Sequence, residues 1–465
     1  MSAPATTGVT ESATTAMEAW LASRDEVRRQ RGIVRTDSIR LWPASPENPA
    51  SPENPASPEN PASPENPASP ENPGNPDSPG NPGYPADPDN PDGGTAGEII
   101  DLASNDYLGL SADPRVIAAS MAALQEYGAG ARASRVVCGS TPAHVKLEEQ
   151  LRALTGQRAA LAFSSGYTAN LGVVTALGGP GTLMVHDAHV HASLIDAVRL
   201  SRSPAVSVPH NDLTAIRAAL QQRTQPRAIV LVESVYSVLG DVANLRSLAQ
   251  MCAESDALLL VDEAHSLGVL GGGRGAVHAA GLAGAPHVAV TATLSKSLGS
   301  QGGAVLGSPT LRKHLVNSAR TFIFDTALAP AAAAGAAEAA RIVLAEPELA
   351  DRVCANASIL ARSCGVPVAA GAVQSIPMES AGRAAEVTEQ LRARGIHVAC
   401  FRPPSVPDGI SRIRLTARAT LTPEQLRRAT EQLAELVGRH GFADTSEHST
   451  DTQPTKESGF DPDKH

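Results

Sequence analysis

The chain has 465 residues, of which 42% are hydrophobic and 3% aromatic, and it carries a formal net charge of -10. This length predicts two or three structural units, because one domain typically takes about 100–200 residues. The acidic balance argues against nucleic acid as a partner. No apolar run reaches the roughly 18 residues of a membrane-spanning helix, so we expect no membrane association.

Cysteine usage indicates the compartment. Five cysteines are scattered along the chain without a CxxC pair, namely Cys138, Cys252, Cys354, Cys364 and Cys400. An odd, dispersed set is typical of reduced thiols and not of a disulfide framework. The first residues also lack the basic-then-apolar order of a secretory signal. We therefore expect a cytoplasmic protein.

Composition shifts divide the chain into segments. Residues 1–16 and 443–465 are polar and are expected to be disordered tails, whereas residues 17–42 have a helical, basic pattern. A Pro- and Asn-rich stretch, 43–97, contains the hexapeptide Ala-Ser-Pro-Glu-Asn-Pro five times in tandem. Proline at this density predicts an extended linker, because it lacks the amide donors of helix and sheet. The repeat is either a ligand for a proline-binding module or an expansion without function, and we favour the second interpretation.

Residues 98–330 are typical of a large α/β domain, because short apolar strands alternate with helical patterns. Strands are predicted at 159–163, 182–185, 205–208, 228–232, 258–261, 289–293 and 304–306. The strands before Ser234 and Asp262 are apolar on both faces, which is typical of buried, mainly parallel strands. A long Ala-rich helix follows, and residues 331–442 predict a small C-terminal α+β domain.

Small, acidic, imidazole or lysine side chains follow five of these strands, at the edge where an open parallel sheet binds its ligands. They include Ser165, Gly166, Tyr167, His186, His189, His191, Ser237, Asp262, His265, Thr293 and Lys296. Any one of them could be incidental, but their concentration on one edge predicts a site.

The residue types indicate the chemistry of that site. The turn at Ser165–Tyr167 opens a helix whose free amides suit a phosphate, although an ordinary helix cap is an equal interpretation. Asp262 ends an apolar strand, where an unpaired carboxylate is costly, so a protonated pyridine nitrogen would suit it as a partner. His265 could donate to a phenolate oxygen, but Asp-x-x-His alone favours a capped turn. Lys296 lies in a small-residue loop where a lysine can be tuned to form an imine, whereas most lone lysines lie on the surface.

The histidines between His186 and His191 raise the question of a metal site. No second cluster of His or Cys lies downstream to complete a coordination shell, so we predict no metal. We expect instead that one of these imidazoles stacks on an aromatic ring.

Six motifs resemble those of the α-oxoamine synthases, a family of pyridoxal 5'-phosphate (PLP) enzymes. They are LASNDYLGL at 102–110, SGYTAN at 165–170, HASL at 191–194, VDEAH at 261–265, TLSK at 293–296 and FRPPSVP at 401–407. The resemblance covers residues 17–40 and 98–441, in the family's order and at its approximate spacing. It implies a PLP-dependent transferase of fold type I, which is aspartate aminotransferase-like, and a homodimer with sites at the interface.

The resemblance also implies roles by position. Lys296 would hold PLP as a Schiff base and then act as the base, Asp262 would face the pyridine nitrogen, and His265 would face the ring hydroxyl oxygen. His191 would stack over the ring. Further cofactor contacts would come from Ser165, Gly166, Tyr167, Ser237 and Thr293, and substrate contacts from Asn105, Arg402 and Arg35, with Arg28 as the second choice for the N-terminal arginine.

The motif at 401–407 favours the branch of the family that condenses L-alanine with pimeloyl-CoA or pimeloyl-acyl carrier protein and releases carbon dioxide. One alternative is a sister synthase that takes glycine or serine with a different acyl-CoA. Another is an inactive fold that acts through the proline repeat, against which the intact Lys296 argues.

Two departures from the family pattern lie close to the predicted site. Ala131-Arg132-Ala133 replaces a glycine-rich segment, and Ser266 replaces a glycine that commonly follows the histidine. If that turn requires a positive φ, Ser266 would strain it.

Overall fold

The computed structural model describes residues 99–403, 406 and 408–437, together with the helical residues 17, 20, 23, 26, 27, 29 and 30. The tails expected at 1–16 and 443–465 and the linker expected at 43–97 lie outside the described residues. So do Arg28 and Arg35 of the expected helical segment 17–42. Among the residues that are described, no helix is long and apolar enough to cross a membrane.

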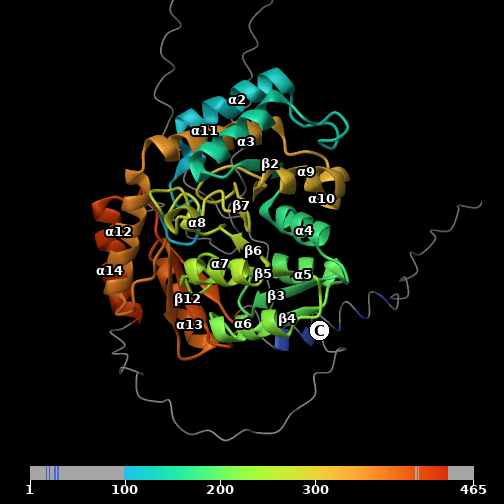
Figure 1. The fold of residues 1–465 in the computed structure, drawn as a ribbon. Coiled ribbons are helices and arrows are strands. Elements are labelled where there is room, and N and C mark those ends of the chain that lie inside the picture. The colour runs from blue at the N-terminus through green and yellow to red at the C-terminus, as the bar shows by residue number, and fades with distance from the viewer. Residues whose placement is uncertain are drawn as a thin grey trace, which may run out of the picture. The chain divides into compact units, whose positions relative to one another are not determined.

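Seven of the described strands form a central sheet in the order β2-β8-β7-β6-β5-β3-β4 (Figure 1). Their bounds are β2 Ala159–Phe163, β3 Thr182–Asp187, β4 Ala205–Val208, β5 Arg227–Glu233, β6 Leu258–Asp262, β7 Val288–Thr293 and β8 Gly303–Gly307. Neighbouring strands are parallel except β8, which is antiparallel to β2 and β7. Every strand predicted from the sequence is present, and the predicted mainly parallel sheet is confirmed.

Successive residues of these strands point to opposite faces, so the sheet has an apolar core on each side. Val230 and Val261 belong to one core cluster, and their neighbours Leu231 and Leu260 belong to the other. Helices must therefore cover both faces. One face carries α4 Gly166–Leu177, α5 Ala192–Ser201, α9 Pro309–Ser318 and α10 Arg320–Ile323.

The opposite face is covered by a larger set of helices, which are α2 Pro114–Tyr127, α3 Pro142–Thr155, α6 Leu213–Gln222, α7 Leu245–Glu254, α8 Ala276–Ala279 and α11 Pro330–Ala345. Helices α2, α3 and α11 lie side by side (Figure 1). Ala333, Ala336 and Ala340 of α11 are fully buried, and their small side chains let the three helices pack closely. The domain boundary proposed at 330/331 stays a prediction, although α11 begins there.

The C-terminal part of the described chain combines helices with a small sheet, and the separate domain predicted at 331–442 stays a prediction. An antiparallel sheet in the order β11-β12-β9 consists of β9 Val373–Pro377, β11 Ala399–Phe401 and β12 Arg412–Thr416. The helices of this part are α12 Glu348–Ser363, α13 Ala381–Ala393 and α14 Pro423–Val437. The first described strand, β1 Ile100–Asp101, pairs in parallel with β10 Ile396–His397. The motif at 102–110 therefore begins next to the C-terminal strands.

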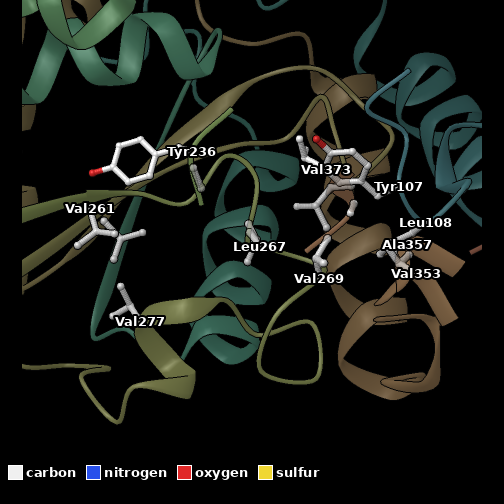
Figure 2. Close-up of a cluster of buried hydrophobic side chains, with 14 of the residues drawn as sticks. Tyr107, Leu108, Tyr236, Val261, Leu267, Val269, Val277, Val353, Ala357 and Val373 are labelled. Carbon is white, nitrogen blue, oxygen red and sulfur yellow. The ribbon is translucent and has the colours of Figure 1, made fainter. Parts of the chain in front are cut away.

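That motif is anchored in the core before it reaches the short 3-10 helix η1 Leu110–Ala112. Tyr107 and Leu108 are buried, and Figure 2 shows them near Val353 and Ala357 of α12 and Val373 of β9. The Tyr107 ring fills apolar space while its hydroxyl remains available for hydrogen bonds. Burial of this ring fixes the polar residues on either side of it.

Candidate active site

The carboxyl ends of β3, β5, β6 and β7 meet at one edge of the sheet, because these strands run parallel. Loops from this edge bring several of the predicted side chains together. Lys296, which follows β7, reaches His265, which follows β6. Gly166 at the start of α4 abuts Thr293 at the end of β7, so the loop after β2 belongs to the same edge.

A chain of hydrogen bonds runs from Lys296 into the core. Lys296 Nζ lies 2.7 Å from His265 Nε2, and His265 Nδ1 lies 2.7 Å from the Tyr107 hydroxyl. Tyr107 donates in turn to Asn105 Oδ1 at 3.0 Å. Because an ammonium group can only donate, a neutral His265 accepts at Nε2 and donates from Nδ1. The chain thus fixes one tautomer of His265.

The surroundings change the proton affinity of both groups. Burial lowers the pKa of Lys296 to about 8, although the charges of Asp262 and Glu233 act in the opposite direction. Burial also holds the pKa of His265 well below its usual range, helped by the charges of Lys296 and Arg414. Near pH 7, His265 is therefore neutral. Lys296 has more free amine than an ordinary lysine, which makes it a better nucleophile and base.

Asp262 is tied to His191 through two polar residues. Its Oδ2 accepts from Asn170 Nδ2 at 2.8 Å, and its Oδ1 accepts from the Ala264 amide at 2.9 Å. Asn170 Nδ2 also donates to Ser193 Oγ at 2.9 Å, and Ser193 Oγ lies 2.8 Å from His191 Nδ1. Asp262 is only 5% exposed and forms no ion pair with the described residues. A buried carboxylate in this state suits a cationic partner.

Asn170 was overlooked as a separate site residue, although it lies inside the motif at 165–170. The spacing within the motif could have indicated it, because Asn170 lies one helical turn after Gly166 and therefore on the same face of α4. Its amide orients the carboxylate of Asp262, which makes it part of the site.

Glu233 is a second such residue, because it directly follows the strand predicted at 228–232 but no role was predicted for it. It ends β5 in register with Asp262 and is only 2% exposed. Its Oε2 accepts from the Ser237 amide at 3.1 Å, whereas its Oε1 has no partner among the described residues. Burial, followed by the charge of Asp262, raises the pKa of Glu233 to about 8. The Glu233 carboxyl therefore favours its protonated form more than an ordinary glutamate does, and it holds Ser237 through the backbone amide of that residue.

The turn at the start of α4 forms a small anion cradle. Ser165 caps the helix by accepting from the Thr168 amide at 3.1 Å, and the amides of Gly166 and Tyr167 have no acceptor among the described residues. A Cβ on Gly166 would lie 3.1 Å from Thr293 Cβ, so glycine permits this close approach. Thr293 Oγ1 lies 2.7 Å from Ser295 Oγ. The side chain of Tyr167 is exposed, and its hydroxyl bonds to Asp196.

Arg414, on β12, completes the polar surroundings and was also overlooked. Its Nε donates to the Ser237 carbonyl at 2.7 Å and its Nη2 donates to Asn105 Oδ1 at 3.1 Å. The guanidinium lies 5.7 Å from the Phe401 ring centroid. The residue is 4% exposed, yet it has no carboxylate partner among the described residues. The alternation Arg412-Ile413-Arg414 within an apolar strand was the available signal, because period two places both arginines on one face.

Arg402 follows β11 and is half-buried. Its guanidinium has no hydrogen-bond acceptor among the described residues, so the structure leaves it available without placing it in the network around Lys296. Arg35 and Arg28 cannot be placed, since both lie outside the described residues. Of the predicted substrate contacts, Asn105 is therefore the one that the hydrogen bonds join to Tyr107 and Arg414.

The strain predicted at Ser266 was wrong. The described non-glycine residues with positive φ are Arg132, Arg202, Asn211 and Asp256, and Ser266 is not among them. The Ser266 side chain instead accepts from Ser234 Oγ at 2.8 Å in a buried position. The other departure is the strained one, because Arg132 has a φ of 69° where the family usually has glycine-rich sequence.

The histidines at 186–191 have separate partners. His186 Nδ1 lies 3.0 Å from the Asp187 carbonyl, His189 stacks on His210, and His191 caps α5. Within the described part of the chain, no group of His, Cys, Asp or Glu side chains is arranged to hold a metal ion.

Comparisons with known proteins match the part of the chain that forms this site. A family model described as aminotransferase class I and II matches residues 97–433. An 8-amino-7-oxononanoate synthase of Mycolicibacterium gilvum (strain PYR-GCK) is 52% identical over 345 residues, which cover 74% of this chain and 91% of the relative. One of Mycobacterium marinum (strain ATCC BAA-535 / M) is 51% identical over 342 residues, which cover 73% and 88%.

Solved structures are similar over the same part. A serine palmitoyltransferase from S. paucimobilis, solved with a bound PLP-myriocin aldimine, has 32% sequence identity and a TM-score of 0.70, covering 73% of this chain and 88% of that one. The 8-amino-7-oxononanoate synthase from Francisella tularensis has 26% identity and a TM-score of 0.61, covering 73% and 98%.

Proposed function

We propose that this chain, which belongs to the aminotransferase class I and II family and within it to the α-oxoamine synthases, is an 8-amino-7-oxononanoate synthase. It is then a PLP-dependent acyltransferase of biotin biosynthesis that condenses L-alanine with pimeloyl-CoA or pimeloyl-acyl carrier protein and releases carbon dioxide. The observation that carries the proposal is the meeting of Lys296, His265 and Asp262 at one edge of the sheet. It occurs in a chain 52% identical to relatives that bear this name.

The side chains present fit PLP. The free amides of Gly166 and Tyr167, beside the hydroxyl of Thr293, would hold the phosphate. Asp262, buried without an ion-pair partner, would hold a protonated ring nitrogen. Lys296 would hold the cofactor covalently through its amine. When bound, PLP supplies an electron sink that stabilises negative charge on the Cα of the amino acid.

Lys296 is also placed to move the Cα proton. Its Nζ already lies within hydrogen-bond distance of His265 Nε2, and burial lowers the Lys296 pKa to about 8. A base with a pKa near the working pH takes up a proton and releases it with little cost in either direction. His265, held neutral and fixed by Tyr107, supports the amine without competing for its proton.

Arg414 is the residue that we propose for the carboxylate of L-alanine. It is buried near Lys296 and lacks a carboxylate partner among the described residues, so an arriving carboxylate would supply the missing anion. Asn105 and the Ser237 carbonyl orient the guanidinium, which leaves Nη1 for the substrate. Arg402, at the end of β11, is proposed as a second contact for the substrates.

We propose a homodimer. Helix α2 exposes Ile117, Met121 and Leu124 at 41%, 55% and 47%, and their spacing places them on one face. An exposed apolar stripe of this kind is typical of a surface that a partner covers. We infer a cytoplasmic location from the unpaired cysteines, two of which, Cys252 and Cys364, are buried as free thiols. The net charge of -10 argues against nucleic acid as a partner, and we propose neither a nucleic-acid nor a membrane partner.

The alternative within the family is a different pair of substrates, such as serine with a longer acyl-CoA. The structural likeness to serine palmitoyltransferase supports this alternative, whereas the higher identity to the 8-amino-7-oxononanoate synthases favours L-alanine. A role for an inactive fold through the proline repeat concerns segments outside the described residues. The arrangement of Lys296, His265 and Asp262 argues against it.

The test combines a spectrum with a product assay. Purified protein incubated with PLP should develop a visible absorption band that Lys296→Ala abolishes. With pimeloyl-CoA or pimeloyl-acyl carrier protein, L-alanine should give 8-amino-7-oxononanoate, measured by mass spectrometry, at a higher rate than glycine or L-serine gives its own product. A protein that takes up no PLP would refute the enzyme proposal. A preference for serine or glycine would move the chain to a sister synthase.

A further inference from the structure

A charged cluster beside the site links two of the loops that surround it. Asp187 ends β3, His210 lies between β4 and α6, and Asp241 lies between β5 and α7. His210 Nδ1 is 2.9 and 3.1 Å from the two carboxylate oxygens of Asp187, and its Nε2 is 2.8 Å from Asp241 Oδ2. Asn211 adds a second link, because its amide donates to Asp187 at 2.7 Å and its side chain donates to Asp241 at 2.9 Å.

The geometry requires His210 to be a cation. Each ring nitrogen faces a carboxylate oxygen, so both must donate. Burial alone would lower the pKa of His210, but the hydrogen bonds to Asp187 and Asp241 outweigh it and raise the pKa to about 9. His189 stacks on the ring at a centroid distance of 4.1 Å, and Tyr236 meets it edge-on at 4.4 Å. One charge is thus shared by two carboxylates.

Asp187 shapes the loop that leads to His191. Its Oδ1 accepts from the His189 amide at 2.7 Å, and its carbonyl accepts from the Val190 amide at 3.4 Å. The Ala188 amide donates to the carbonyl of Val208 at the end of β4. His191 follows directly as the N-cap of α5. The turn closed by Asp187 therefore sets where His191 stands.

Asp241 shapes the loop that carries Ser237. The Asp241 carbonyl accepts from the Tyr236 amide at 2.9 Å, and the Gly240 amide donates to the Tyr236 carbonyl at 2.9 Å. Ser237 lies within this closed loop, and its own carbonyl receives the hydrogen bond from Arg414. Movement of Asp241 would therefore be transmitted to both Ser237 and Arg414.

We propose that His210 is a positioning residue. Its cation fastens the His191 loop to the Ser237 loop through Asp187 and Asp241, and so sets the separation of two walls of the cofactor site. The inference rests on the proposed function, because the positions of His191 and Ser237 have consequences only if PLP binds between them. Lys296 and His265 lie on other loops, so His210 acts on the walls and not on the group that holds the cofactor.

His210→Gln in the PLP-loaded enzyme tests this assignment, since glutamine keeps hydrogen-bonding groups but removes the charge. The visible band that depends on Lys296 should still form. The circular dichroism of that band per bound cofactor should fall, and PLP should bind more weakly. The value of kcat should drop roughly 10- to 100-fold, as expected when the walls of the site are misplaced by about 1 Å. The matched control is His314→Gln, on the exposed surface of α9, which should resemble the wild type in all three measurements.

Asp241→Asn provides a second variant in case His210→Gln folds poorly, because the Asp241 side chain is 39% exposed and tolerates substitution more easily. It should change the circular dichroism and kcat in the same direction. The double variant should be no worse than His210→Gln, because both changes remove one bridge. The proposal is overturned if the single variants lower thermal stability but leave circular dichroism and kcat at wild-type values, or if their losses simply add. Failure of the proposed function would show separately, as wild-type protein that forms no band or no product.

Discussion

Replacement of Arg414 by methionine should weaken the use of L-alanine, because it removes a buried cation that has no carboxylate partner among the described residues. Nε and Nη2 already donate to Ser237 and Asn105, so Nη1 is left for one substrate oxygen. A hydrogen bond between charged groups contributes about 1.5–3 kcal/mol. Since about 1.4 kcal/mol corresponds to a factor of ten, kcat/KM for L-alanine should fall roughly 10- to 150-fold.

Arg412→Met is the matched control for this experiment. Arg412 lies on the same strand, two residues earlier, and is also buried, but its guanidinium is paired with Asp408 and donates to the Ile410 carbonyl. Its loss should lower stability, measured by urea unfolding, and leave kcat/KM for L-alanine close to the wild-type value. Arg414→Lys should recover part of the activity, because it keeps the charge but not the planar fork.

Two results would refute this reasoning about Arg414. One is a kcat/KM for L-alanine in Arg414→Met that matches the wild type when the enzyme is saturated with PLP. The other is an equal loss in Arg412→Met, because that would trace the effect to the strand and not to the free donor. Steady-state kinetics at saturating pimeloyl-CoA distinguish both results from the expected one.

Three further predictions concern the titration of buried or half-buried groups. In the cofactor-free protein, the rate at which an amine-specific reagent modifies Lys296 should rise with pH and reach half its maximum at about pH 8, since burial lowers the Lys296 pKa to that value. A half-maximal rate near pH 10 would contradict this prediction. Glu233→Gln should raise the stability of the cofactor-free protein at pH 9 more than at pH 4. The reason is that the Glu233 pKa is raised to about 8, so the stability that the wild-type carboxyl contributes is full at low pH and is lost as pH rises through 8. Equal effects of the substitution at both pH values in thermal melts would contradict this. His210 should contribute stability below about pH 6.5 that is lost as pH rises through about 9, so His210→Gln and wild type should melt closer together at pH 10 than at pH 6.

The fold was largely predictable from the sequence because its strands are short, apolar and separated by helical patterns. Leu258–Val261 is apolar on both faces, and the structure buries it in the middle of the sheet. The reversed direction of β8 could not be predicted, because a strand such as Gly303–Gly307 has the same apolar pattern in either direction. The pairing of β1 with β10 was missed for a similar reason, since two residues contain no periodicity.

The meeting of Lys296, Asp262 and His265 at one edge of the sheet could be predicted because each of them follows a strand predicted from the sequence. Arg414 was missed because it lies within a strand, where a charged residue gives no local sign of which partner it will meet. Glu233 ends its strand as Asp262 does, but it belongs to none of the six motifs. The error at Ser266 arose from a glycine preference, and the φ values show that Arg132 bears that conformation instead. Distances between loops, such as those that join Asp187, His210 and Asp241, depend on packing that spacing along the chain does not contain.

The antiparallel strand β8 also determines when the site can form during synthesis. Strand β2, which leads into the phosphate cradle, pairs with β8 alone among the described strands, and its partner Gly303 lies about 140 residues further along the chain than Phe163. At about 5–20 residues per second, the ribosome needs roughly 7–30 s to make that stretch. Through this interval the apolar strand Ala159–Phe163 has no partner to pair with, so the nascent chain must be shielded until β8 emerges.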